Sequence, residues 1–194
     1  MLDFTNSWNG RIVLVTQSHP RGVADAIGLA KDFVGDEPFA CIMPDCLLFS
    51  GKPHAQQLLQ VFERYQKNVI STIFVRGADV KRFGNVGLLG TQRLDGECFL
   101  ITSLSDKKPE PLTARPGETI HKGFGGGIYL PEYFDLIETT RPRAKGEIDD
   151  VPIHQILVKQ GKLLGVLLEG AAFDAGHHLG FQAAVHYAGR RIKR

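Results

Sequence analysis

Two carboxylates follow apolar segments of the sequence and could together bind a metal ion. Asp45 comes just after the apolar run 39–43, and Asp174 lies between an apolar run at 163–168 and Gly176. An acidic side chain just past a buried strand of an α/β sheet lies at the crevice where such folds bind ligands. Two carboxylates at that place could hold one Mg2+ ion between substrate phosphates, the usual arrangement for this small, hard ion. The alternative for Asp45 is an ordinary strand-end or turn residue.

Two lysines could supply positive charge to a phosphate group. Lys107 and Lys108 follow a predicted strand at 98–105 and precede Pro109. An ammonium group at this place could neutralise a phosphate, because lysine is a compact point charge on a flexible stem. The alternative is a solvated turn.

Three other patterns are weaker indications of a functional site. The glycines of 123–127 indicate either a β-bulge with a ligand close to the backbone, or a plain flexible turn. The segment 87–93 superficially resembles a phosphate-binding loop, but no helix is predicted after it, so we interpret it as a turn. His177 and His178 are adjacent, so their rings point in different directions and a zinc site is not expected.

Strands and helices alternate in the first part of the chain. Apolar, β-branched runs predict strands at 11–16, 39–43 and 69–75, and apolar residues at helical spacing predict helices at 23–34 and 54–66. Such alternation predicts a mostly parallel sheet with helices on both faces.

The order changes after Val75, where the pattern predicts an antiparallel or mixed extension of the sheet. The further strands are expected at 83–89, 98–105, 122–130 and 163–168. The further helices are expected at 131–139, 149–160 and 179–190.

The composition limits the classes of protein to which the chain can belong. A length of 194 residues fits one domain, 1–194, within the usual range of about 100–200 residues. A net charge of +2 with scattered basic residues argues against a nucleic-acid surface. Three cysteines without a CxxC pair indicate reduced thiols, and no leader or membrane-spanning run is recognisable. We therefore expect a cytoplasmic protein that binds neither nucleic acid nor membranes.

Several segments match the motifs of one enzyme family in order and spacing. Residues 17–26 match Q-x-x-P-x-G-x-x-H-A, with Asp25 in place of the His, and residues 33–39 read F-V-G-D-E-P-F. Residues 105–109 are similar to a V-E-K-P motif, and residues 146–148 read G-E-I. On these motifs nearly the whole chain resembles the bacterial UTP–glucose-1-phosphate uridylyltransferases, also called UDP-glucose pyrophosphorylases.

The resemblance implies a metal site and a catalytic cation. Asp45 and Asp174 match the family's Mg2+ ligands, and Cys46 stands where the family usually has a second acid. Lys107 matches the lysine that binds the sugar phosphate, with Lys108 as the alternative because the motif contains one extra residue.

The same resemblance implies substrate contacts. Gln17 and Gly22 belong to the segment whose backbone touches the uracil. Asp106 and Glu147 match acids that bind sugar hydroxyls, and Gly125 matches a glycine that lies against the glucose.

The fold and the reaction follow from the resemblance as expectations. The fold is expected to be α/β, a Rossmann-like nucleotidyltransferase fold of the glycosyltransferase-A type with a mixed central sheet. The family's N-terminal strands and its G-x-G-T-R phosphate loop are expected to be missing, because nothing before Arg11 matches them. The reaction would be the Mg2+-dependent conversion of UTP and glucose-1-phosphate to UDP-glucose and pyrophosphate.

Two alternatives remain open from the sequence. One is a non-catalytic subunit that binds a sugar nucleotide or pairs with a full-length homologue, and the other is a thymidylyltransferase. Family members commonly form dimers or tetramers, so a homo-oligomer is also an expectation.

Overall fold

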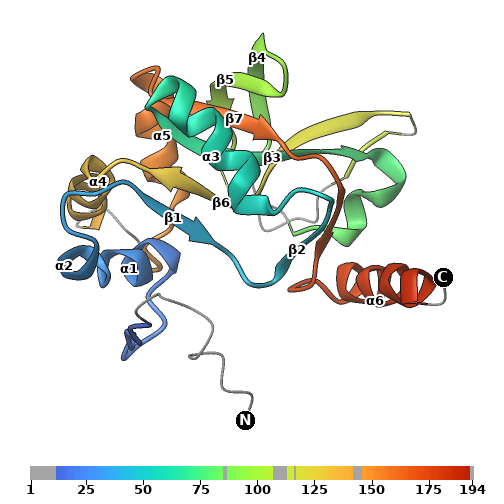
Figure 1. Cartoon of the computed structure of the whole chain (residues 1–194), viewed down its shortest axis with the longest axis horizontal. Coiled ribbons are helices and arrows are strands. Elements are labelled where there is room, and N and C mark those ends of the chain that lie inside the picture. The colour runs from blue at the N-terminus through green and yellow to red at the C-terminus, as the bar shows by residue number, and fades with distance from the viewer. Residues whose placement is uncertain (1–11, 85–86, 107–112, 116, 142–145, 193–194) are drawn as a thin grey trace.

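A computed structural model describes residues 12–84, 87–106, 113–115, 117–141 and 146–192 of the chain. Its centre is a six-stranded sheet with the strand order β1-β6-β3-β7-β5-β4, and a separate two-stranded sheet pairs β2 with β8 (Figure 1). The strands of the large sheet are β1 (Phe39–Ile42), β3 (Asn68–Arg76), β4 (Leu89–Asp95), β5 (Cys98–Leu104), β6 (Thr119–Tyr129) and β7 (Leu163–Leu167). The small sheet consists of β2 (Cys46–Phe49) and β8 (Ala171–Asp174). The helices are α1 (Val23–Gly28), α2 (Lys31–Val34), α3 (His54–Tyr65), α4 (Glu132–Thr140), α5 (Val151–Lys159) and α6 (His178–Ile192), together with the 3-10 helix η2 (Gly77–Arg82).

The large sheet is mixed and mostly antiparallel. Only β3 and β7 pair in parallel, and the other neighbouring strands of this sheet pair antiparallel. The expectation of a mixed sheet is confirmed, but the prediction of a mostly parallel one is wrong. The reason is that β6, from the second half of the chain, inserts between β1 and β3. Periodicity locates a strand, but it does not say which strands become neighbours.

The predicted strand at 11–16 is also wrong for its described part. Residues 12–16 form no strand and are exposed, with Leu14 91% accessible to solvent. β-branched residues favour a strand only where a partner strand and a packed face are available. The predicted strand at 83–89 is displaced as well, since the ladder there begins at Leu89, preceded by a single bridge between Leu88 and Lys122.

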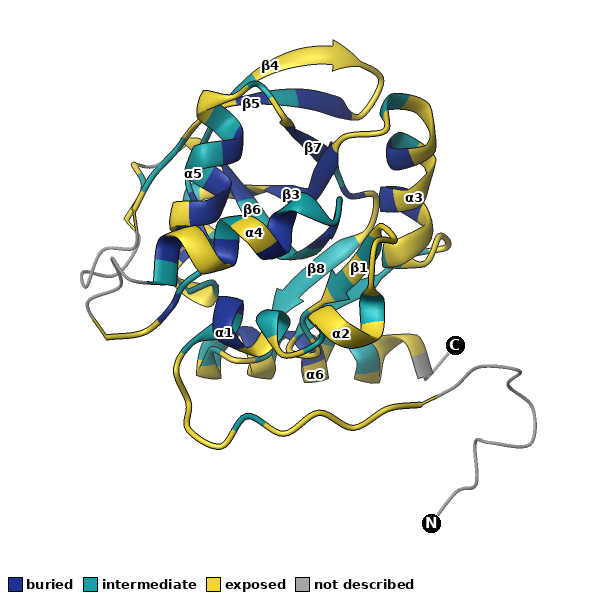
Figure 2. Ribbon diagram, turned by 90° about the vertical axis from the view of Figure 1, so that its left-hand side faces the viewer, coloured by how far each residue is buried: buried dark blue, intermediate teal, exposed yellow. Residues whose placement is uncertain are grey.

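Helices cover both faces of the large sheet (Figure 2). Neighbouring residues of a strand point to opposite faces, so Val69 packs with α3 and Ile70 packs with α4 and α5. On the α3 side the fully buried Leu58 anchors the contact. Burying such a side chain contributes about 1.5–3 kcal/mol relative to leaving it exposed. The predicted helices that supply these contacts are therefore confirmed.

The small sheet is attached to the large one at the ends of β1 and β7. β2 follows β1 after a short turn, and β8 follows β7 in the same way. A separate core cluster joins the two sheets, in which Val75, Phe124 and Leu168 pack with Leu48 and Ala172. α6 packs against β8 at the periphery of the molecule (Figure 1). This arrangement brings the first residue of β2 opposite the last residue of β8.

Candidate functional site

The two predicted metal ligands lie together at the small sheet. Cys46 pairs with Asp174 in the β2–β8 register, and Asp45 directly precedes Cys46. The backbone N–H of Ala175 donates to the carbonyl of Asp45 at 2.7 Å. A methyl group built on Gly176 would lie 2.6 Å from Asp45 Oδ2 and 3.3 Å from Asp174 Oδ1. Both carboxylates therefore face one small space, which the glycine leaves open.

Backbone donors fix the carboxylate of Asp174. Gly84 N donates to Asp174 Oδ2 at 2.7 Å, and His177 N donates to Asp174 Oδ1 at 3.2 Å. A carboxylate held in this way keeps its orientation before any ligand arrives. Gly84 was not a candidate from the sequence, because a single glycine in a loop carries no signal of its own.

A buried lysine lies beside this carboxylate. Lys122 of β6 is 4% exposed, and its Nζ donates to the carbonyl of Gly84 at 2.9 Å. Its Nζ also lies 5.4 Å from the ring centroid of Phe83, within cation–π range. Burial lowers the pKa of the Lys122 ammonium, while the negative charge of Asp174 raises it. Lys122 could not be selected from the sequence. The alternation of residues along β6 does not show which face of the strand is buried, and a lysine in a strand is ordinarily expected to face solvent.

Cys46 is a protonated thiol at neutral pH. Burial, followed by the charges of Asp45 and Asp174, raises the pKa of Cys46 to about 12. A neutral thiol is a poor ligand for a hard cation, which prefers carboxylate oxygens. In the part of the chain that the structure describes, no group of three or more His, Cys, Asp or Glu residues is arranged to hold a metal ion. The residues present fit Mg2+ only in the mode in which two carboxylates share it with water and substrate phosphates.

The carboxylates open into a cleft of about 330 Å³. Asp45, Asp174 and Lys122 line it together with Gly125, and Asp150 also contributes to its wall. Gly125 has φ +69°, and a side chain there would collide with Cβ of Cys46. The backbone at Gly125 can therefore follow the cleft wall only without a side chain.

A buried polar cluster of a histidine and two tyrosines borders the same cleft. His154 Nε2 lies 3.1 Å from the hydroxyl of Tyr129 and 3.3 Å from that of Tyr133. Burial lowers the pKa of His154 to about 4, and burial raises the pKa of both tyrosines well above their usual value. All three groups are thus neutral at pH 7. His154 and Tyr129 line the cleft, where they offer hydrogen-bonding groups that sequence reasoning did not select.

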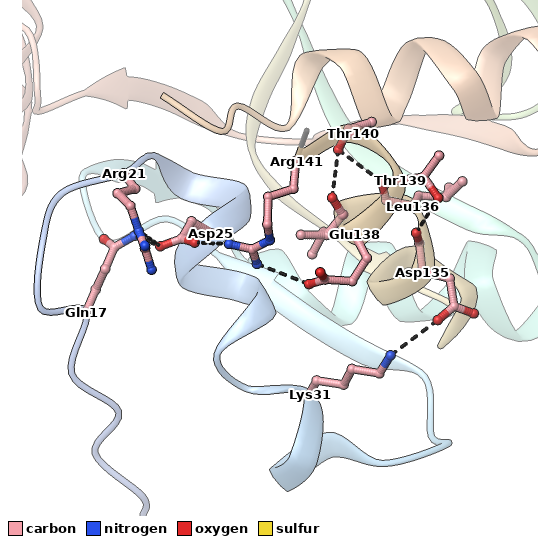
Figure 3. Close-up of polar contacts among 11 residues, drawn as sticks. Gln17, Arg21, Asp25, Lys31, Asp135, Leu136, Glu138, Thr139, Thr140 and Arg141 are labelled. Atoms are coloured by element: carbon pink, nitrogen blue, oxygen red, sulfur yellow. Dashed lines mark hydrogen bonds and ion pairs between the residues drawn. The ribbon is translucent and has the colours of Figure 1, made fainter. Parts of the chain in front are cut away.

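The predicted base-contacting residues belong to a second cluster (Figure 3). Gln17 Nε2 donates to Asp25 Oδ2 at 2.6 Å and to the carbonyl of Gly22 at 3.2 Å. Arg141 donates to Asp25 Oδ1 at 2.5 Å, and Arg21 donates to Asp25 Oδ2 at 3.2 Å. The hydrogen bond from Gln17, and then those from Arg141 and Arg21, hold the pKa of Asp25 below its usual value despite burial. Asp25 therefore organises this segment as a buried anion.

The Gly22 turn packs directly on the segment that contains Glu147. Ile148 N donates to Arg21 O at 2.6 Å, and Ala24 N donates to Ile148 O at 3.1 Å. Gly22 has φ +106°, and a side chain on it would collide with the Ile148 carbonyl. Glu147 is exposed next to this contact. The structure thus brings Gln17, Gly22 and Glu147 into one region.

The remaining candidates lie beyond the end of β5. Asp106 is exposed and accepts a hydrogen bond of 2.7 Å from Gln155 Nε2. Lys107 and its alternative Lys108 lie outside the described residues.

Among the helices of the described ranges, none is long and apolar enough to cross a membrane.

Comparison with known proteins relates this arrangement to one family. A sequence profile of the nucleotidyl transferase family matches residues 2–186. The UTP–glucose-1-phosphate uridylyltransferase of Streptococcus pyogenes is 30% identical over 193 residues, which cover 97% of this chain and 61% of that protein. A second such enzyme, from the serotype M1 strain, is 28% identical over 97% of this chain and 62% of its own length. The chain thus spans about three fifths of the curated relatives it matches.

Solved structures show the same fold. A UDP-glucose pyrophosphorylase complexed with UDP-glucose aligns with a TM-score of 0.74 at 21% identity, covering 91% of this chain and 65% of the other. A UTP-bound UGPase from Acinetobacter baumannii aligns with a TM-score of 0.66 at 22% identity, covering 87% and 57%. The expected Rossmann-like fold with a mixed sheet is thereby confirmed.

Proposed function

Because this chain belongs to the nucleotidyl transferase family, we propose that its cleft binds a sugar nucleotide and serves the interconversion of UTP plus glucose-1-phosphate with UDP-glucose plus pyrophosphate. The observation that carries this proposal is the pair of carboxylates, Asp45 and Asp174, which face one space at the cleft. In this reaction a phosphate oxygen of the sugar phosphate attacks the α-phosphorus of UTP in line, and pyrophosphate leaves.

The metal proposed for this site is Mg2+. Asp45 and Asp174 would hold it, and when bound it would offset the negative charge of the substrate phosphates. The two backbone hydrogen bonds to Asp174 support this role, because they keep the carboxylate oriented toward the cleft. Cys46 contributes no charge at neutral pH, so the local negative charge comes from the two aspartates.

Positioning of the substrate is proposed for Gly125 in the wall of the cleft and for residues that lie outside this wall. Gln17 and Gly22 are proposed for the uracil side, and the backbone of Gly125 is proposed for the sugar side. Asp106 and Glu147 are proposed as partners of sugar hydroxyls; both are exposed and thus accessible to a ligand.

A lysine after β5 would complete the site. Lys107 is proposed as the catalytic cation that neutralises the sugar phosphate. Catalysis of this kind depends on alignment of the reacting groups and on charge neutralisation, because the protein forms no covalent bond to substrate.

Ligand-induced stabilisation is the direct test of this function. UDP-glucose at about 100 times its dissociation constant adds about 2.7 kcal/mol to the free energy of unfolding, a rise of roughly 5–11 °C in Tm for a chain of this size. We expect this rise in Mg2+, and a clearly smaller rise with GDP-glucose, which differs from UDP-glucose only in the base. Equal responses to both sugar nucleotides, or no response to either, would contradict the proposal. Release of pyrophosphate from UTP and glucose-1-phosphate then measures turnover.

A further inference from the structure

Lys122 is the cation of the cleft. Among the described residues that line it, Asp45, Asp150 and Asp174 are the acids and Lys122 is the only lysine or arginine. The neighbouring His154 is neutral at pH 7, because burial lowers its pKa to about 4. A diphosphate that enters this cleft therefore meets three carboxylates, and in the described wall one ammonium group offsets them.

The position of this ammonium is fixed relative to Asp174. The peptide groups of Gly84 link the two side chains, because Gly84 N donates to Asp174 and Gly84 O accepts from Lys122. The ammonium and the carboxylate are thus held side by side at the cleft wall. A bound phosphate in contact with a cation on Asp174 would lie within the field of the ammonium as well.

The burial of Lys122 is costly for a structural role alone. Removing an ammonium from water costs several kcal/mol unless charged or polar partners compensate. Within the described part of the chain, Nζ donates one hydrogen bond, to Gly84 O, whereas an ammonium carries three donors. A neutral amide could donate to this carbonyl at a lower desolvation cost. Asp174 offsets part of this cost, but burial remains the larger influence on the pKa of Lys122, so a further anion in the cleft would stabilise the charged form.

We propose that Lys122 binds a phosphate group of the sugar nucleotide, so that the cleft retains affinity for a diphosphate when no divalent cation is present. The inference rests on the proposed function for the identity of the nucleotide. It does not rest on that function for the phosphate site, which inorganic pyrophosphate probes independently.

Titration calorimetry in EDTA tests the phosphate site. We expect the protein to bind UDP-glucose and inorganic pyrophosphate, and Lys122→Met to bind both about 10- to 100-fold more weakly, the loss expected for a hydrogen bond to a charged group. Uridine, which lacks phosphate, should bind both proteins equally. The matched control is Lys162→Met, which removes an exposed lysine paired with Glu132 at 3.2 Å and should change neither affinity.

A second variant separates phosphate binding from a structural role. Lys122→Gln keeps a donor for Gly84 O but removes the charge. Wild-type affinity in Lys122→Gln, or equal weakening of uridine and UDP-glucose in Lys122→Met, would assign Lys122 a structural role and overturn the proposal. If the wild-type protein binds neither UDP-glucose nor pyrophosphate in EDTA, the proposal is likewise wrong. If it binds pyrophosphate through Lys122 but does not bind UDP-glucose even in Mg2+, the phosphate site stands and the proposed function fails.

Discussion

Cys46 and Asp174 face each other in register across the antiparallel β2–β8 pair. This pairing places Asp45, the residue before Cys46, beside the turn that follows Asp174, where Ala175 N donates to Asp45 O at 2.7 Å. The small sheet thus holds the two carboxylates close to each other.

The first prediction concerns Asp174 as a metal ligand. Asp174→Asn keeps the shape of the side chain and one acceptor oxygen for the backbone donors, but removes the charge that attracts a cation. We expect the gain in UDP-glucose affinity on adding Mg2+ to fall at least about tenfold, measured by calorimetry in Mg2+ and in EDTA. Asp135→Asn is the control, since Asp135 is 79% exposed and paired with Lys31. An unchanged Mg2+ effect in Asp174→Asn would remove this residue from the metal site.

The second prediction concerns the reactivity of Cys46. The thiolate is the reacting species, and a pKa of about 12 leaves little of it at pH 8. We expect alkylation of Cys46 in the native protein to be roughly 1000-fold slower than in guanidinium, where the thiol returns to a pKa of about 8.5. Peptide mass spectrometry resolves Cys46 from Cys41 and Cys98. Rapid native labelling of Cys46 would show that its surroundings do not suppress ionisation.

The third prediction separates backbone strain from collision at Gly125. Gly125 and Gly35 have nearly equal φ values, +69° and +65°, but only at Gly125 would a side chain meet other atoms, those of Cys46 and His54. Gly35→Ala should cost about 1–3 kcal/mol, because its backbone, with φ +65° and ψ −136°, is in a region that residues with a side chain rarely adopt. Gly125→Ala should cost about 1–3 kcal/mol more, because it also overpacks the cleft wall. Urea unfolding measures both, and equal losses would contradict the collision.

The fourth prediction is a pH dependence from His154. Burial lowers its folded pKa from 6.5 to about 4, so between these values the unfolded chain binds a proton that the folded chain does not. This contribution to stability is complete above pH 6.5 and is lost as the pH falls toward 4, by about 3 kcal/mol in all. We expect His154→Gln to flatten the pH dependence of the free energy of unfolding in this window.

The control for this pH effect is His186→Gln, which changes an exposed histidine on α6. In this variant the free energy of unfolding should depend on pH between pH 4 and 6.5 as it does in the wild-type protein. If His154→Gln also kept the wild-type pH dependence, the loss of stability at low pH would come from other groups.

Periodicity predicted the elements that have a clear buried face. α3 and β3 agree closely with their predicted ranges, because their apolar residues follow the helical and extended patterns that packing requires. β2 and β8 were not predicted as strands, since each has four residues and an unbroken pattern of intermediate burial. Residues 12–16 show the opposite error, because they have a strand composition but no strand beside them among the described residues.

Only part of the candidate site could be selected from the sequence, for a physical reason. Asp45 and Asp174 could be selected because each follows an apolar run at a turn. Lys122 could not be selected, because its burial depends on Gly84 and Phe83, which reach it from another part of the fold. Gly84 itself acts through its backbone N–H and C=O groups, and the type of a residue does not show what its backbone groups will contact.

The β2–β8 pair joins two distant parts of the chain, and this determines when the site can form during folding. Hydrogen bonds between strands so far apart in sequence require closure of a long loop, which is slow compared with the formation of α3 or the β4–β5 hairpin. The carboxylate pair should therefore assemble late, after the large sheet has formed. Since the small sheet has only two short strands, it should also open by local fluctuation more easily than the six-stranded sheet does. Protection of the Ala175 amide from hydrogen exchange would then report the intact site rather than the folded chain.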